Sequence, residues 1–146
     1  MQRNSLGSDG ADRLGALELF VGTTIGERRM LARLVDELVC EEGETIMHEG
    51  STEYEFVVIE EGSAEVTQHG EPINELGAGA FFGELGVLGD GAPRTASVTA
   101  TSRLRGLAFT AHFMREVGER FPAVGERIDE AAKEHLRADA ARGADA

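Results

Sequence analysis

Residues 81–98 read FFGELGVLGDGAPRTASV, the stretch of this chain that decides the fold. Gly83 precedes Glu84 and Leu85, and glycine lets a backbone take positive φ or approach a ligand closely. A short helical turn after Gly83 would point free amide N–H groups at an anion. Arg94 follows a glycine-rich tip and begins an alternating run that predicts a strand. The expected ligand therefore carries an anionic group for Arg94 and hydroxyl donors for Glu84, as a sugar phosphate does.

Two pieces of this stretch, Phe82 to Gly86 and Pro93 to Val98, resemble the phosphate-binding cassette of the cyclic nucleotide-binding domain family. That family includes the regulatory domains of cAMP-dependent kinases, catabolite activator proteins and cyclic nucleotide-gated channels. The resemblance covers roughly residues 14–137 and implies a β-roll that binds cAMP or cGMP. The interval between Glu84 and Arg94 is one residue longer than the usual spacing, within a glycine-rich tip where loops accept insertions at little cost.

The resemblance also implies a role for each cassette residue. Arg94 is expected to pair with the cyclic phosphate, and Glu84 is expected to hold the ribose 2′-hydroxyl. The implied ligand-binding set is Gly83, Glu84, Leu85, Arg94, Thr95 and Ala96. A structural alternative is that Glu84 is only a solvated acid at a turn with Arg94 as its partner, and that Thr95 is only a strand residue.

The remaining parts of the expected pocket come from the roll and from the end of the chain. Val58 and Leu76 are expected to supply apolar backing. The final helix corresponds by position to the family's mobile lid, so His135 or Leu136 is its expected contact with the ligand. A plain packing helix is the alternative interpretation of that segment.

The chain as a whole predicts a mainly β domain with flanking helices. Helical spacing predicts N-terminal helices within residues 13–35, and Thr24 with Glu27 fits a capping box. Short alternations punctuated by glycine over residues 38–110 predict an eight-stranded antiparallel β-roll, of the double-stranded β-helix or jelly-roll kind. C-terminal lid helices are expected over residues 111–137, with an interruption near Pro122. Residues 1–12 and 138–146 are expected to be a flexible N-terminus and a flexible tail.

Composition limits the partners. The formal net charge is −13, from 27 acidic residues against 14 lysines and arginines, and this balance disfavours nucleic-acid binding. No apolar run reaches the ~18 residues of a membrane-spanning helix. The N-terminus lacks the apolar region of a secretory signal, so a cytoplasmic protein is expected. Cys40 is the single cysteine and is expected to be a small buried hydrophobe.

An enzyme is not expected. The four histidines, which stand apart from one another, show no pairing typical of a β-barrel metal site, and no catalytic triad is evident. No metal and no cofactor are therefore predicted.

The predicted function is a regulatory sensor that binds a cyclic nucleotide, with closure of the C-terminal helix as its output. We expect cAMP rather than cGMP on family frequency, although the hydroxyl of Thr95 keeps cGMP open. The chain would act alone, act on a separate effector protein, or be part of a longer chain, as a monomer or a weak homodimer. The alternatives are an interaction or scaffold protein whose roll no longer binds nucleotide, and a metal-dependent β-barrel enzyme.

Overall fold

The computed structural model describes residues 1–50, 55–83, 96–127, 130 and 133–134. The elements, in chain order, are β1 (Gln2–Ser5), α1 (Gly10–Gly15), the 3₁₀ turn η1 (Glu18–Phe20), α2 (Ile25–Ala32), β2 (Asp36–Cys40), β3 (Thr45–Met47), β4 (Glu55–Glu61), β5 (Ala64–Gln68), β6 (Glu71–Leu76), β7 (Phe81–Phe82), β8 (Ser97–Ala100), β9 (Leu104–Thr110) and α4 (Ala111–Arg120). Residues 122–127, after the predicted interruption at Pro122, are helical as well.

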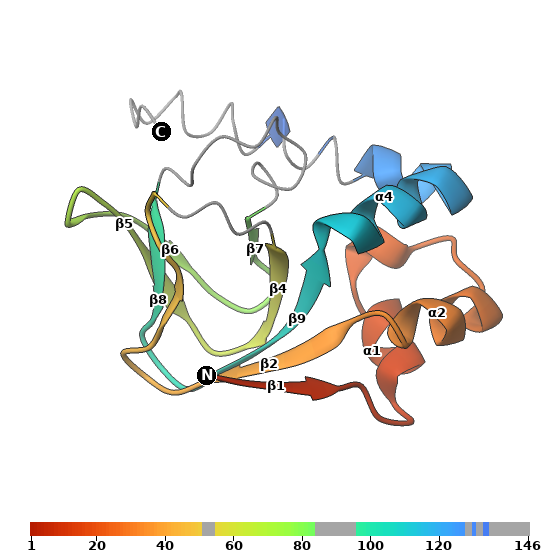
Figure 1. The fold of residues 1–146 in the computed structure, drawn as a ribbon, viewed down its shortest axis with the longest axis horizontal. Coiled ribbons are helices and arrows are strands. Elements are labelled where there is room, and N and C mark those ends of the chain that lie inside the picture. Colours follow the sequence, from red (N-terminus) through yellow and green to blue (C-terminus); the bar gives the residue numbers. More distant parts are fainter. Residues whose placement is uncertain (51–54, 84–95, 128–129, 131–132, 135–146) are drawn as a thin grey trace.

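The strands form two antiparallel sheets that face each other as a roll (Figure 1). One sheet has five strands in the order β1-β2-β9-β4-β7, and the other has four in the order β3-β8-β5-β6. In Figure 1 the helices α1, α2 and α4 all lie at one end of the roll. This arrangement confirms the predicted antiparallel β-roll with flanking helices, and β2 to β9 are its eight predicted strands.

The N-terminal residues differ from the sequence-based prediction of a flexible segment over residues 1–12. Gln2–Ser5 form β1, which pairs with β2 in a register that sets Gln2 opposite Val39 and Ser5 opposite Asp36. Gly10 already begins α1. The reason is that β2 has an open edge, and main-chain hydrogen bonding there does not require an apolar sequence.

The predicted capping box begins α2. The amide of Glu27 donates to the Thr24 hydroxyl at 3.1 Å, and the amide of Thr24 donates to the Glu27 carboxylate at 2.7 Å. The helix ends at Ala32, earlier than the predicted end at Val35, because β2 starts at Asp36 and needs extended backbone.

The core has two parts, separated by the five-stranded sheet. Along β4, Phe56 and Val58 point to the helical side, while Val57 and Ile59 point into the space between the sheets. Both faces of β4 are therefore buried, which explains its continuous apolar sequence. Cys40 is fully buried between the sheets, as predicted, and burial raises the pKa of its thiol.

Candidate functional site

A cavity of about 1390 Å³ opens between the roll and the helical end of the molecule. Its lining includes Val58 from β4, Leu76 from β6, Gly79 and Ala80 from the β6–β7 connection, and Phe81 from β7. The sequence predicted Val58 and Leu76 as pocket residues, and the structure brings both to this cavity. Each is largely buried, which makes this wall of the cavity apolar.

The β6–β7 connection is held against β4 by two main-chain hydrogen bonds. The amide of Gly79 donates to the carbonyl of Ile59, and the amide of Ile59 donates to the carbonyl of Ala80, each at 2.8 Å. These bonds keep the connection beside Val58, the neighbour of Ile59 in β4. The wall is thus positioned by the sheet rather than by a free loop.

Gly83 lies immediately after β7 and has a φ of 88°. A Cβ at this position would be 2.2 Å from the carbonyl oxygen of Glu55, so only glycine lets the two backbones approach this closely. The Glu55 carboxylate accepts hydrogen bonds from both Nη atoms of Arg3, at 2.7 and 2.5 Å. Gly83, the first cassette residue, therefore lies against β4, and Arg3 of β1 binds the same strand through Glu55.

Ala96 lies at the other end of the cassette and is buried. The adjacent Ser97 begins β8, and its hydroxyl accepts a hydrogen bond from the amide of Glu49 at 2.9 Å. Gly83 directly follows β7 and Ala96 directly precedes β8, so these two residues flank residues 84–95. The predicted site residues Glu84, Leu85, Arg94, Thr95, His135 and Leu136 lie outside the described residues.

The opposite rim of the cavity comes from both ends of the sequence. Leu17, Glu18 and Val21 line it from the N-terminal side, and the C-terminal side contributes a charged group consisting of Glu126, Arg127, Glu130, Lys133 and Glu134. Sequence reasoning did not find this rim. The signal in the sequence is the mixed-charge segment after Pro122. The family resemblance assigned this segment to the lid but named none of these five charged residues.

Arg127 joins these two halves of the rim. Its Nη1 donates to the carbonyl oxygens of Leu19, at 3.5 Å, and of Val21. Its Nη2 also lies 3.5 Å from where a Cβ on Gly22 would be. The helical residues 122–127 are therefore attached to the segment that follows η1, across a sequence separation that no local pattern reveals.

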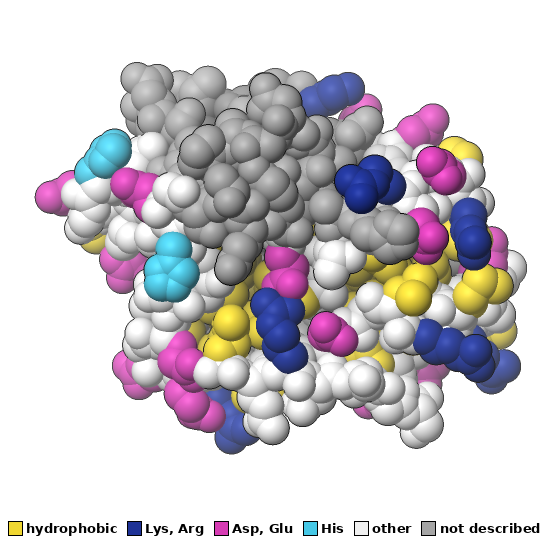
Figure 2. All heavy atoms as spheres, viewed as in Figure 1, with side chains coloured by type: hydrophobic (Ala, Val, Ile, Leu, Met, Phe, Trp, Pro, Cys, Tyr) yellow, Lys and Arg dark blue, Asp and Glu magenta, His cyan; other side chains and the backbone are white. Residues whose placement is uncertain are grey.

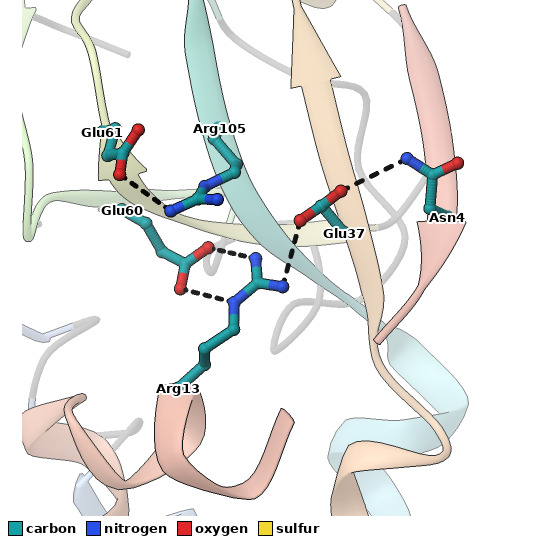
Figure 3. A network of polar contacts seen from close by, with 6 residues as sticks. All are labelled: Asn4, Arg13, Glu37, Glu60, Glu61 and Arg105. Carbon is teal, nitrogen blue, oxygen red and sulfur yellow. Dashed lines mark hydrogen bonds and ion pairs between the residues drawn. The ribbon is translucent and has the colours of Figure 1, made fainter. Parts of the chain in front are cut away.

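A network of polar contacts fixes α1 to the sheet (Figure 3). Arg13 donates to both carboxylate oxygens of Glu60, at 3.1 and 2.5 Å, and lies 3.0 Å from Glu37, which accepts from Asn4. The hydrogen bond to Glu60 raises the pKa of Arg13. Because α1 leads directly into Ala16 and Leu17 at the cavity, this network helps to position the rim.

The family model for the cyclic nucleotide-binding domain matches residues 37–121, which is more than half of the chain. The chain belongs to the cyclic nucleotide-binding domain family. The match runs from the second residue of β2 through β9 and α4, and therefore contains β7 and β8, the strands on either side of the cassette. No group of histidine, cysteine and acidic residues within the described residues could hold a metal ion. No helix among them is long and apolar enough to cross a membrane.

Individual relatives agree with this family membership. A cAMP-dependent protein kinase regulatory subunit from Yarrowia lipolytica is 40% identical over 81 residues, which cover 54% of this chain and 21% of the relative. A cAMP-binding acyltransferase from Mycobacterium smegmatis is 29% identical with a TM-score of 0.71, over 88% of this chain and 41% of that chain. A putative cyclic nucleotide-binding protein from Geobacter metallireducens has the same fold, with 22% identity and a TM-score of 0.74, over 91% of this chain and 98% of that one.

The chain spans about a fifth of the length of the first curated relatives it matches. Cyclic nucleotide-binding domains therefore occur in longer proteins with different activities, including a kinase regulatory subunit and an acyltransferase.

Proposed function

We propose that this chain is a regulatory sensor that binds cAMP in the cavity beside Val58 and Leu76. The observation that carries the proposal is the position of the cassette's two ends. Gly83 is fixed against Glu55 and Ala96 is buried next to β8, so residues 84–95 connect two strands of the roll that belongs to this family. The cavity volume of about 1390 Å³ exceeds the ~300–1,000 Å³ of typical small-molecule pockets, so it is large enough for a mononucleotide.

In this proposal Arg94 pairs with the cyclic phosphate, and Glu84 accepts a hydrogen bond from the ribose 2′-hydroxyl. The amides of Gly83 and Leu85, with Thr95 and Ala96, complete the phosphate site. An arginine can donate two parallel hydrogen bonds to a phosphate, which a point charge cannot do. The strong overall negative charge does not oppose this, because charges beyond ~8–10 Å are screened by salt.

Val58 and Leu76 would then contact the apolar parts of the nucleotide, and His135 or Leu136 would contact it from the C-terminal lid. Closure of this lid would be the output, since a ligand that binds the closed state more tightly shifts the population toward it. A C-terminal domain boundary at residue 137, a cytoplasmic location and a monomer or weak homodimer are parts of the same proposal. The predicted tail over residues 138–146 lies outside the described residues. We propose no catalytic activity for the residues of this chain.

The preference for cAMP over cGMP is supported by relatives whose names contain cAMP, a kinase regulatory subunit and an acyltransferase. Isothermal titration calorimetry with each nucleotide tests it directly. Tighter binding of cAMP is expected, and the absence of heat with both nucleotides would favour the scaffold alternative.

The phosphate role of Arg94 is tested by Arg94→Ala, with Arg33→Ala as the matched control because Arg33 is exposed at the end of α2. Loss of a charge-assisted hydrogen bond worth about 1.5–3 kcal/mol weakens affinity about 10- to 150-fold. The control is expected to bind as the natural chain does. Equal affinities of the two variants would refute the phosphate role.

A further inference from the structure

Most of the exposed large hydrophobic side chains among the described residues lie in or beside α2. Among the described residues, the exposed large hydrophobic side chains are Met1, Val21 at 57%, Ile25 at 42%, and Met30 and Leu34 at 51% each. All except Met1 fall within residues 21–34. Met30 lies in α2, and Leu34 lies two residues beyond the end of that helix, in a turn where its amide donates to the carbonyl of Leu31 at 3.0 Å.

Folding does not require this exposure. The inner side of this segment is provided by Leu31 and Val35, which are almost completely buried in the helical part of the core. Met30 and Leu34 are both half-exposed, and polar residues at these two positions would cost no core packing. Contiguous exposed apolar residues with a polar border are typical of interaction sites.

The border of this apolar pair is basic. Arg29 of α2 and Arg33, which directly follows that helix, are exposed, and within the described part of the chain neither forms an ion pair. Arg28 instead donates to the carbonyl of Thr23 at 2.5 Å. Figure 2 shows yellow hydrophobic and dark blue basic side chains side by side at the right, where α2 lies. This local positive charge stands out on a chain with net charge −13.

We propose that the surface formed by Arg29, Met30, Arg33 and Leu34, the α2 surface, docks an acidic amphipathic helix of a partner protein. An apolar pair on such a helix would pack on Met30 and Leu34, and methionine adapts its shape to different partners. Carboxylates one turn apart on the same helix would meet Arg29 and Arg33, each of which can donate two hydrogen bonds to a carboxylate.

Charge complementarity favours an acidic helix over a second copy of the chain, an anionic lipid surface or nucleic acid. A second copy in a two-fold dimer would bring the same two arginines face to face. Anionic lipid or nucleic acid would be attracted by α2 but repelled by the acidic remainder of the chain.

The test uses the full chain without nucleotide, so that its outcome does not depend on the proposed function. The probe is a fluorescently labelled synthetic helix with leucines at i and i+4 and glutamates flanking them; the reference probe has lysine at every glutamate. Fluorescence anisotropy is expected to show tighter binding of the acidic probe, although the protein is itself strongly acidic. Added salt is expected to weaken that binding.

Variants assign the binding to the α2 surface. The double variant Arg29→Glu with Arg33→Glu is expected to lower the affinity for the acidic probe at least about fivefold, because two ion pairs are lost and two repulsions are added. Met30→Ser with Leu34→Ser should also weaken it. The control, Arg103→Glu with Arg120→Glu, changes the net charge equally at exposed positions and should bind as the natural chain does. Circular dichroism confirms that each variant is folded.

Four results would overturn the proposal. These are equal or tighter binding of the basic probe, an equal loss in the control variant, concentration-dependent self-association that Met30→Ser with Leu34→Ser abolishes, and binding to vesicles of anionic lipid with none to the acidic probe.

Discussion

Replacing Gly83 with alanine tests whether the start of the cassette is fixed by backbone contact. The residue has a φ of 88°, and left-handed backbone costs a residue with a Cβ about 1–2 kcal/mol. The new Cβ would be 2.2 Å from the Glu55 carbonyl oxygen, whereas real Cβ atoms essentially never approach within 3.0 Å. The neighbour is main chain, so β4 and the start of the cassette must move apart, which adds about 1–3 kcal/mol.

The matched control is Gly70→Ala. Gly70 has a similar φ of 80°, in the turn between β5 and β6, but a Cβ added there would meet nothing within 4 Å. Gly70→Ala therefore loses only the free energy that left-handed backbone costs a residue with a Cβ. We expect the free energy of unfolding to fall by about 2–5 kcal/mol in Gly83→Ala and by about 1–2 kcal/mol in Gly70→Ala.

Urea denaturation followed by circular dichroism measures both free energies, with an unchanged m-value as the sign that only stability has changed. Calorimetry with cAMP under native conditions gives the second readout: affinity should fall in Gly83→Ala and stay unchanged in Gly70→Ala. Equal losses of stability in the two variants would show that the contact with Glu55 contributes nothing, and the reasoning about the cassette's position would then be wrong.

Three further predictions follow from single side chains. Arg13→Met leaves the half-buried Glu60 without its bidentate partner and should cost about 2–3 kcal/mol, between the values for exposed and buried ion pairs; a loss below about 0.5 kcal/mol in urea denaturation would contradict it. Burial raises the pKa of Cys40 above its ordinary 9.0, so the folded state favours the neutral thiol. The contribution of this group to the free energy of unfolding is therefore fully present below pH 9 and declines as the pH rises further. The native thiol should resist a disulfide reagent at pH 8, and prompt labelling would show that it is accessible. Arg127→Ala should speed amide hydrogen exchange in residues 122–127 with little change in the core, whereas the exposed Arg120→Ala should not.

The sequence predicted the elements whose signals are local. The apolar run at β4 predicts a buried strand, and Thr24 with Glu27 predicts the start of α2, because each pattern lies within a few residues. The burial of Cys40 followed from its apolar neighbours in the same way. Val58 and Leu76, which the sequence analysis named as apolar pocket residues, both line the cavity, and their contact with a ligand stays a prediction.

Features that depend on distant residues could not be predicted. The contact of Arg13 with Glu60 joins residues 47 apart in sequence, and a chain with 27 acidic residues offers too many possible partners. The bonds from Arg127 to the segment after η1 span more than a hundred residues. Strand β1 was missed for a different reason: its polar residues carry no alternation, and it forms because β2 offers an open edge.

Strand β1, which the sequence did not predict, and the start of the cassette both contact Glu55. Its carbonyl oxygen lies against Gly83, and its carboxylate accepts two hydrogen bonds from Arg3 of β1. Deleting residues 1–5 therefore removes a strand of the sheet together with the contacts of the N-terminal amine with Glu44, Arg3 with Glu55 and Asn4 with Glu37, whereas Arg3→Ala keeps the strand. Because an exposed ion pair contributes about 0.2–1 kcal/mol, Arg3→Ala should have a small effect on stability.

The deletion should lower the free energy of unfolding by more than Arg3→Ala does, and it should weaken cAMP binding because β4 supports the first residue of the cassette. Urea denaturation and calorimetry on the two variants measure the difference. If the deletion matches Arg3→Ala in both, then β1 merely covers the edge of β2, and the roll can be taken to begin at β2, as the sequence alone suggested.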